Sequence, residues 1–276
     1  MDDEEEESMT GILDQYIGDW EAHVALGHYT GIFEFNKFGQ NPVVNTTPED
    51  LWPLGGVHTD LTTGTTLNIT SDDAGDTQVI RITGLDANWN LQVVDVTLTG
   101  TTPAQIGDAL GWTSVFRMVQ VSAAPACTGD IYATVDGAGY TAGVPDNVAD
   151  VQAYADFGSI TTPRSTQQLW GVVPAGYNVI IYDYSAEIET SGGTTRSVEA
   201  LLMVAELAKG AQVHAPTWAP YRMVHDLTLS TAASVHDTMP FKMPLVYGPL
   251  TRVSLRATAS SNSVVGGHIT AVLLPQ

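Results

Sequence analysis

The sequence is short of cysteine, lysine and long apolar runs, and each shortage removes a class of protein. Its 276 residues include a single cysteine, Cys127, which excludes an intrachain disulfide and a thiolate zinc site. No run of about 18 apolar residues occurs, so the sequence predicts no membrane-spanning helix. Residues 2–7 are all acidic, whereas a secretion signal begins with basic residues and continues with apolar ones. We therefore expect a protein that neither crosses a membrane nor leaves its host cell through such a signal.

Basic residues are scarce, with 10 Lys and Arg against 31 Asp and Glu, which gives a net charge of −21 and a pI near 4.3. Nucleic-acid binding needs clustered Lys and Arg to neutralise phosphates, so the charge argues against a nucleic-acid partner. Two interpretations of the charge remain: an ordinary acidic protein, or one adapted to molar salt. At roughly 1 M ionic strength the Debye length falls to about 3 Å, so crowded carboxylates repel one another little. We favour a halophilic or marine origin.

Local sequence patterns divide the chain into four expected segments. Residues 1–28 predict an acidic disordered tail followed by a short helix or arm, because six carboxylates cannot pack and the apolar residues after them share one helical face. Residues 29–135 and 167–276 predict two β-sandwich domains, the second jelly-roll-like, because short alternating apolar runs are bounded by turn residues. Residues 136–166 are rich in Gly, Asp, Pro and Ala and predict a loop or linker. The predicted fold class is all-β.

The clearest strand patterns occupy short, regularly spaced runs, and one further segment is ambiguous. The runs are residues 66–70, 78–82, 93–98, 177–184, 223–229, 252–259 and 267–274. Residues 197–207 contain good helix formers but also alternate as a buried strand would. We interpret this segment as a strand because its surroundings are β.

No motif in the sequence predicts catalysis, a cofactor or a metal. The histidines form neither His-x-x-x-His nor His-Glu-x-x-His; they are His23, His28, His58, His214, His225, His236 and His268. A histidine–carboxylate metal site assembled in space stays open as a minor alternative. Asp72, Asp73 and Asp76 crowd one turn without the twelve-residue ligand order of an EF-hand, so we favour a solvated acidic turn over a calcium site.

Two further candidates for chemistry are weak. Gly137 and Gly139 form a Gly-x-Gly without the third glycine or the strand-to-helix setting of a nucleotide fold, which predicts a flexible loop. Cys127 has no activating charge among its sequence neighbours, so we expect a small buried hydrophobe and not a nucleophile.

Six tryptophans are spread along the chain: Trp20, Trp52, Trp89, Trp112, Trp170 and Trp218. Exposed tryptophans would form a carbohydrate-binding surface, whereas buried ones fill sandwich cores or subunit interfaces. We favour the core or a subunit interface.

Three stretches keep an order and approximate spacing that resemble a family of tailed-phage virion proteins, described as head fibre, capsid decoration or generic structural proteins. They comprise residues 37–42 (KFGQNP) with 49–52 and 55–56, residues 84–90 (GLDANWN) with 96–102, and residues 168–176 (QLWGVVPAG). The likeness covers residues 35–276 and is strongest in the first half. The acidic N-terminus and sparse lysine depart from the bacterial-phage members and favour a virus of a haloarchaeon or of a marine host.

The resemblance implies a non-enzymatic virion protein on the capsid surface, as decoration, cement or turret, made in the host cytoplasm. Its implied partners are a major capsid protein and copies of itself in a homotrimer or homopentamer, with the trimer slightly favoured. The resemblance implies no catalytic, cofactor-binding or metal-binding residues. A tail, baseplate or receptor-binding component of the same virion is the second interpretation. A secreted carbohydrate-binding or surface-layer protein is the third.

The charge leads to a prediction about salt. Because carboxylate repulsion is screened at high ionic strength, the melting temperature should rise as NaCl is increased from dilute buffer to about 1 M or more. A thermal unfolding series in NaCl, with circular dichroism as the readout, measures this. A protein most stable in dilute buffer would contradict the halophilic interpretation.

Overall fold

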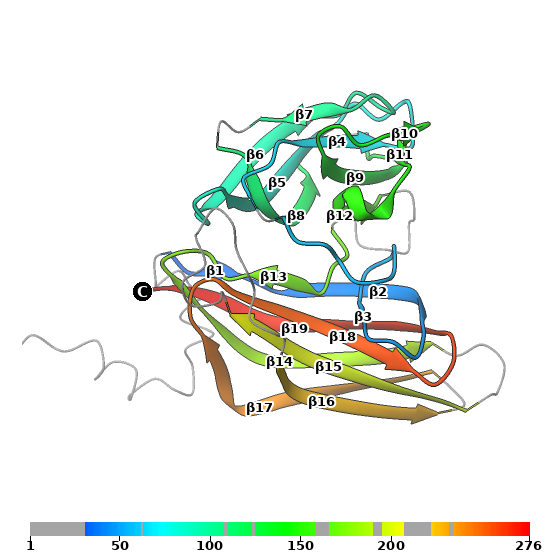
Figure 1. Cartoon of the computed structure of the whole chain (residues 1–276), viewed down its shortest axis with the longest axis vertical. Helices are drawn as coiled ribbons and strands as arrows, with labels where there is room; N and C mark the ends of the chain where they lie inside the picture. Colours follow the sequence, from blue (N-terminus) through cyan, green and yellow to red (C-terminus); the bar gives the residue numbers. More distant parts are fainter. Residues whose placement is uncertain are drawn as a thin grey trace, which may run out of the picture.

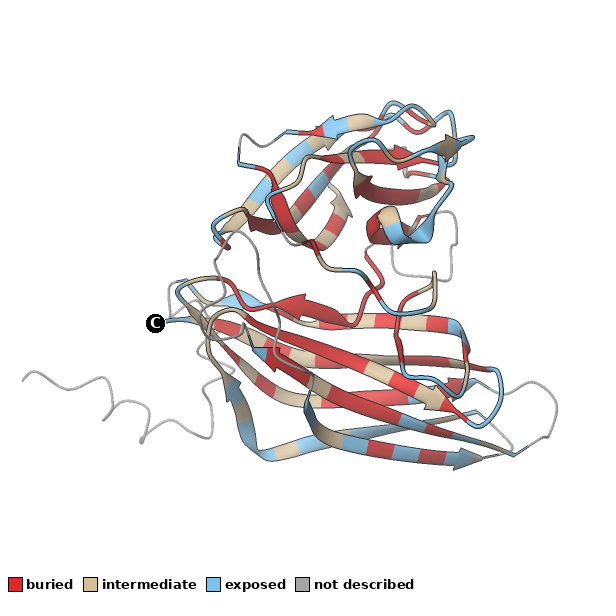
Figure 2. Cartoon of the chain, viewed as in Figure 1, coloured by how far each residue is buried: buried red, intermediate tan, exposed pale blue. Residues whose placement is uncertain are grey.

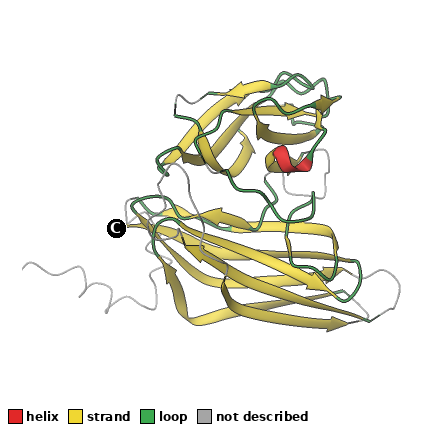
Figure 3. Cartoon of the chain, viewed as in Figure 1, coloured by secondary structure: helices red, strands yellow, loops and turns green. Residues whose placement is uncertain are grey.

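The computed structural model describes residues 31–61, 63–107, 110–122, 125–157, 166–189, 195–206, 222–231 and 234–276. Over these ranges the chain forms strands, turns and one three-residue 3-10 helix, Val148–Asp150, so the predicted all-β class is confirmed (Figure 3). No helix in the described ranges is long and apolar enough to span a membrane. The acidic tail and short helix expected in residues 1–28 lie outside the described residues.

Two facing antiparallel sheets form the larger of two bodies (Figure 1). One sheet contains β1 (Phe33–Glu34), β2 (Lys37–Val44), β19 (Ser263–Pro275), β14 (Tyr177–Glu189) and β17 (Val235–Tyr247). The other contains β3 (Glu49–Asp50), β13 (Trp170–Val172), β18 (Thr251–Ala259), β15 (Arg196–Glu206) and β16 (Arg222–Thr231).

The order of these strands is that of a jelly roll. β1 and β2 pair with successive parts of β19, and β13 and β3 pair with successive parts of β18. The two sheets therefore run β2-β19-β14-β17 and β3-β18-β15-β16. Along the eight strands that form these two orders, the chain crosses from one sheet to the other at every step except between β15 and β16, which pair with each other. This is the eight-stranded double Greek key found in viral capsid proteins, lectins and cupins.

A smaller sandwich is inserted between β3 and β13. Its strands are β4 (Leu67–Ser71), β5 (Val79–Asp86), β6 (Leu91–Thr97), β7 (Ala104–Ile106), β8 (Trp112–Gln120), β9 (Asp130–Val135), β10 (Tyr140–Thr141), β11 (Val144–Pro145) and β12 (Val151–Asp156). They form a β6-β5-β8 sheet, a β12-β9-β4-β7 sheet and a β10–β11 hairpin. Figure 1 shows this inserted domain above the edge of the jelly roll that carries β2 and β13, with β16 and β17 at the opposite edge.

Strand pairing divides the chain differently from the boundaries expected from sequence. β1, β2 and β3 fall within the expected first domain, residues 29–135, but pair with β19 and β18 of the expected second domain. The expected linker, residues 136–166, contains β10, β11, the 3-10 helix and β12. Local alternation predicts that a segment is a strand but carries no information about a partner some 200 residues away.

The predicted strands are confirmed, but several other strands were not predicted. The seven clearest runs coincide with β4, β5, β6, β14, β16, β18 and β19, and β15 confirms the strand interpretation of the ambiguous segment. The longest unpredicted strand is β17, which contains Pro240 and Pro244. Proline cannot donate to a sheet, so it argues against a central strand but is tolerated at an edge, where β17 lies.

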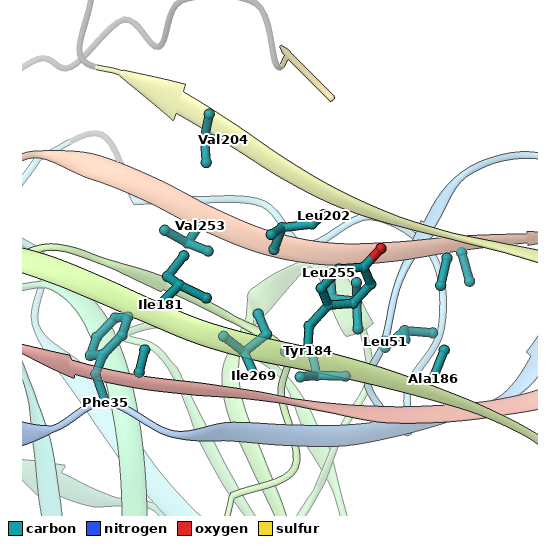
Figure 4. Close-up of a cluster of buried hydrophobic side chains, with 14 of the residues drawn as sticks. Phe35, Leu51, Ile181, Tyr184, Ala186, Leu202, Val204, Val253, Leu255 and Ile269 are labelled. Atoms are coloured by element: carbon teal, nitrogen blue, oxygen red, sulfur yellow. The ribbon is translucent and has the colours of Figure 1, made fainter. Parts of the chain in front are cut away.

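The jelly-roll core lies between its two sheets, and Figure 4 shows the side chains that fill it. Ile181 and Ile269 from one sheet face Leu202, Val253 and Leu255 from the other, and all are at most 2% exposed. A separate core fills the inserted domain. Each body therefore has its own apolar interior, as a stable domain requires.

The jelly-roll core leads to a prediction about stability. Leu255 is fully buried, so replacing it by alanine leaves a cavity, and Leu255→Ala should lower the free energy of unfolding by about 2–5 kcal/mol. Val43, in the same body, is 51% exposed, so Val43→Ala should change it by less than about 0.5 kcal/mol. Denaturant unfolding followed by tryptophan fluorescence compares the two. Equal losses would contradict the described core.

Candidate functional site

The described tryptophans are core residues. Trp52, Trp89, Trp112 and Trp170 are each at most 2% exposed, which confirms the core interpretation for these four. Trp20 and Trp218 lie outside the described residues. None of the four buried rings can form an exposed platform for a sugar.

The acidic turn considered as a calcium site is closed by its own hydrogen bonds. Asp76 is 1% exposed and accepts hydrogen bonds from the Ser71 hydroxyl and from the backbone N–H groups of Thr128 and Gly129. Asp72 is exposed and accepts from the backbone N–H of Asp130. The expectation of a solvated turn is therefore wrong for Asp76, whose carboxylate caps buried backbone groups. In the described part of the chain, no group of three His, Cys, Asp or Glu is arranged to hold a metal.

Cys127 and the Gly-x-Gly segment have structural roles in the inserted domain. Cys127 is 2% exposed, and its Sγ lies 3.4 Å from Oε1 of Gln78. Gly137 and Gly139 lead from β9 into the β10–β11 hairpin, and Gly137 adopts a φ of 84°, which favours glycine. Both segments shape the inserted domain.

One arrangement of polar side chains was not predicted from sequence. On the jelly roll, Nδ1 of His268 lies 2.6 Å from Oγ of Ser185, and Nε2 lies 3.3 Å from Oδ1 of Asp183. The residue types match a hydrolytic triad, but Ser185 is only 1% exposed, so its hydroxyl is hidden from a substrate. Ser185 and His268 are directly paired across β14 and β19, and the contacts join these two strands.

A buried network of hydrogen bonds and ion pairs lies at the junction between the two bodies. Asp50, at the end of β3, is completely buried. Its Oδ1 accepts hydrogen bonds from Nε of Arg256 at 2.9 Å and from the Ser254 hydroxyl at 2.7 Å, both on β18. Its Oδ2 accepts from the backbone N–H of His58 at 2.8 Å, on the segment that enters the inserted domain. One carboxylate therefore joins the jelly roll to that segment.

A second carboxylate completes this junction. Arg252 is 1% exposed, lies 3.7 Å from Oδ2 of Asp50 and donates directly to Asp60. Burial alone would raise the pKa of Asp60, but the Arg252 guanidinium and His58 outweigh it and hold the pKa below its ordinary value. Asp60 thus stays ionised. The buried positive charge of Arg252 is therefore balanced by neighbouring carboxylates, as a buried ion requires.

Aromatic rings cover the ionic part of the junction. The His58 ring stacks on Trp170 at a centroid distance of 4.5 Å, and Trp52 meets Trp170 edge-on at 5.1 Å. Trp52 and Trp170 share a buried apolar cluster with Tyr132 and Tyr154 of the inserted domain. The contact between the two bodies therefore has a buried apolar cluster of its own.

Lys37 forms a second contact between the two bodies. Its Nζ donates to the backbone oxygen of Phe116 in β8 at 3.2 Å and lies 4.7 Å from the ring centroids of Phe35 and Phe116. Burial, with a smaller contribution from Arg117, lowers the pKa of Lys37 from 10.5 to about 7. Gly171 makes room for this side chain, since a Cβ there would lie 2.6 Å from Phe35 and 3.0 Å from Lys37. Together the two contacts hold the inserted domain in one orientation.

Lys37 leads to a prediction about pH. The unfolded state binds a proton at Lys37 up to about pH 10.5, but the folded state only up to about pH 7, so this group makes folding more favourable as pH rises between these values. The rise is at most about 1.4 kcal/mol per pH unit. Lys37→Met should remove it and should be more stable than the wild type below pH 7. Chemical denaturation at several pH values compares the two chains. A constant difference between them from pH 6 to about 9 would contradict the lowered pKa.

Comparisons with known proteins find only low similarity to solved structures of one virus. No protein-family model matches the chain, and no curated protein matches it. A chain in the structure of infectious bursal disease virus of the Gx strain is 10% identical to this chain, with a TM-score of 0.26. A chain in the structure of the Gt strain is 13% identical, with a TM-score of 0.27. Each alignment covers 88% of this chain and 72% of the other chain. The T=1 particles derived from infectious bursal virus are 11% identical with a TM-score of 0.26, over 88% and 69% of the two chains.

Proposed function

We propose that the protein is a structural component of the particle of a haloarchaeal or marine virus. Its jelly roll packs against the shell and neighbouring copies, and its inserted domain projects from the capsid surface as decoration, cement or turret. The observation that carries the proposal is the partition of charge between the two bodies. The jelly-roll topology and the closed junction support it.

The charge partition follows the boundary between the two bodies. Residues 61–157, which contain the inserted domain, include 11 acidic and 2 basic residues. The jelly-roll ranges 31–60 and 166–276 include 11 acidic and 7 basic residues. A surface that faces concentrated salt gains from carboxylates, which keep it hydrated, whereas a surface that packs against protein must avoid like-charge repulsion. The inserted domain has the charge of a solvent-facing part, and the jelly roll has that of a packing part.

Asp130 of the inserted domain shows the combined effect of burial and of neighbouring carboxylates. Burial, together with the neighbouring carboxylates of Asp156 and Asp72, raises the pKa of Asp130 to about 6, although the Tyr154 hydroxyl opposes the rise by donating to it at 2.8 Å. Ionisation of Asp130 therefore costs stability as pH rises through 6. Dissolved cations screen this repulsion, which is consistent with a domain that works in salt.

The buried junction between the two bodies suits an inserted domain that projects from a shell. A domain held by buried ion pairs, a tryptophan pair and a buried lysine keeps one angle to the jelly roll, which lets many copies present the same outer surface. Ser185, which contacts His268, is hidden from a substrate. A non-catalytic role is therefore part of the proposal.

The proposal leads to a prediction about location. Antibodies specific for the inserted domain and for the jelly roll are applied to purified particles with gold detection. The first should label the capsid surface of intact particles, and the second should label them only after disruption, because neighbours cover the jelly roll. Labelling confined to the tail would instead favour the baseplate or receptor-binding role, and particles without either epitope would overturn a virion role.

A further inference from the structure

We propose that the edge of the jelly roll formed by β16 and β17 is the surface through which a second copy of this chain binds. The inference rests on the proposed function and names one of its partners and the contact face. Three properties of the edge carry it: incompletely covered core residues, an unprotected β16, and balanced charge.

The core of the jelly roll is incompletely covered along β17. None of the 13 residues of β17 is buried, although Met239, Phe241, Leu245 and Tyr247 pack against the core. By contrast, Tyr184 on the neighbouring strand β14 is fully buried. Figure 2 shows the change from red in the central strands to tan and pale blue in β17, whereas β16 keeps a few red bands.

Apolar side chains also face solvent on the same edge. Met243 is 82% exposed, Val246 60% and Met223 55%, which makes them the three most exposed large hydrophobic residues in the described chain. All three lie on β16 or β17. Exposed apolar side chains grouped in one place are typical of a protein interface.

The two strands at this edge differ in their protection against pairing. The register of β17 with β14 shifts between the pairs Ile181–Leu245 and Asp183–Pro240, so residues 241–244 bulge out of the ladder. The bulge, two prolines and Lys242 are the features by which proteins keep an edge strand from accepting another strand. β16 spans ten residues without proline, glycine or lysine, and among the described strands it pairs only with β15. We infer that β16 provides backbone pairing and β17 provides apolar contact.

Charge selects a second copy as the occupant. β16 and β17 carry Arg222 and Lys242 against Asp226 and Asp237, so the pair of strands is electrically balanced. When two copies meet through this same face, basic groups of one can lie near acidic groups of the other, as a two-fold contact requires. Contact between two inserted domains would instead bring together bodies with 11 acidic and 2 basic residues each.

The position of the edge suits this contact. β16 and β17 lie on the side of the jelly roll opposite the inserted domain (Figure 1). Two copies joined here therefore keep their acidic inserted domains apart.

The test measures self-association of the full chain. Sedimentation velocity at about 1 to 100 µM protein, in dilute and in molar NaCl, should show a monomer–oligomer equilibrium. The double variant Met243→Asp, Val246→Asp should raise the dissociation constant at least tenfold, because four carboxylates would enter each two-fold contact. Val93→Asp is the matched control: Val93 is 54% exposed on β6 of the inserted domain, and its replacement should leave the association unchanged.

Hydrogen exchange identifies the face directly. Backbone amides of β16 should exchange more slowly at high than at low protein concentration, while those of β6 should not change. Melting temperatures of the variants within a few degrees of the wild type show that each chain is folded. A wild type that stays monomeric throughout, or one whose association Val93→Asp weakens as much as the double variant does, overturns the proposed face. The antibody labelling of particles tests the proposed function independently. If the protein is found on the capsid but associates through another face, the capsid role stands and only the proposed contact face is wrong.

Discussion

The buried carboxylate of Asp50 is the contact on which the relation of the two bodies depends. It receives hydrogen bonds from Ser254 and Arg256 of β18 and from the backbone of the segment that leads into the inserted domain. Removing one partner of a buried ion pair leaves an uncompensated charge, which costs about 3–5 kcal/mol. The same group therefore secures the short strand β3 in the jelly roll and sets where the inserted domain begins.

The sequence predicted what depends on local pattern and missed what depends on distant pairing. Alternating apolar residues identified β4, β5, β14 and β18, and the four described tryptophans lie in the interior as expected. The assignment of β2 and β3 to the jelly roll was missed because their partners, β19 and β18, lie near the other end of the chain. β17 was missed because its two prolines are compatible with an edge strand only.

The junction illustrates the same limit for functional residues. Asp50, Asp60 and Arg252 are ordinary charged residues in the sequence, and no motif connects positions that are about 200 residues apart. Only folding removes Arg252 and Asp50 from water and turns three scattered charges into a network. The uneven charge, in contrast, was visible from composition, but its division between the inserted domain and the jelly roll could be seen only once the insertion point was known.

That insertion point has a consequence for how such a protein diversifies. The chain enters the inserted domain after Leu51 and returns at Leu169, and the backbone N–H of Leu169 donates to the carbonyl of Leu51 at 3.2 Å. Entry and exit are therefore adjacent, so a different domain grafted between these two residues would leave the jelly-roll ladder intact. The jelly roll can therefore carry a different inserted domain without a change in its own strand pairing.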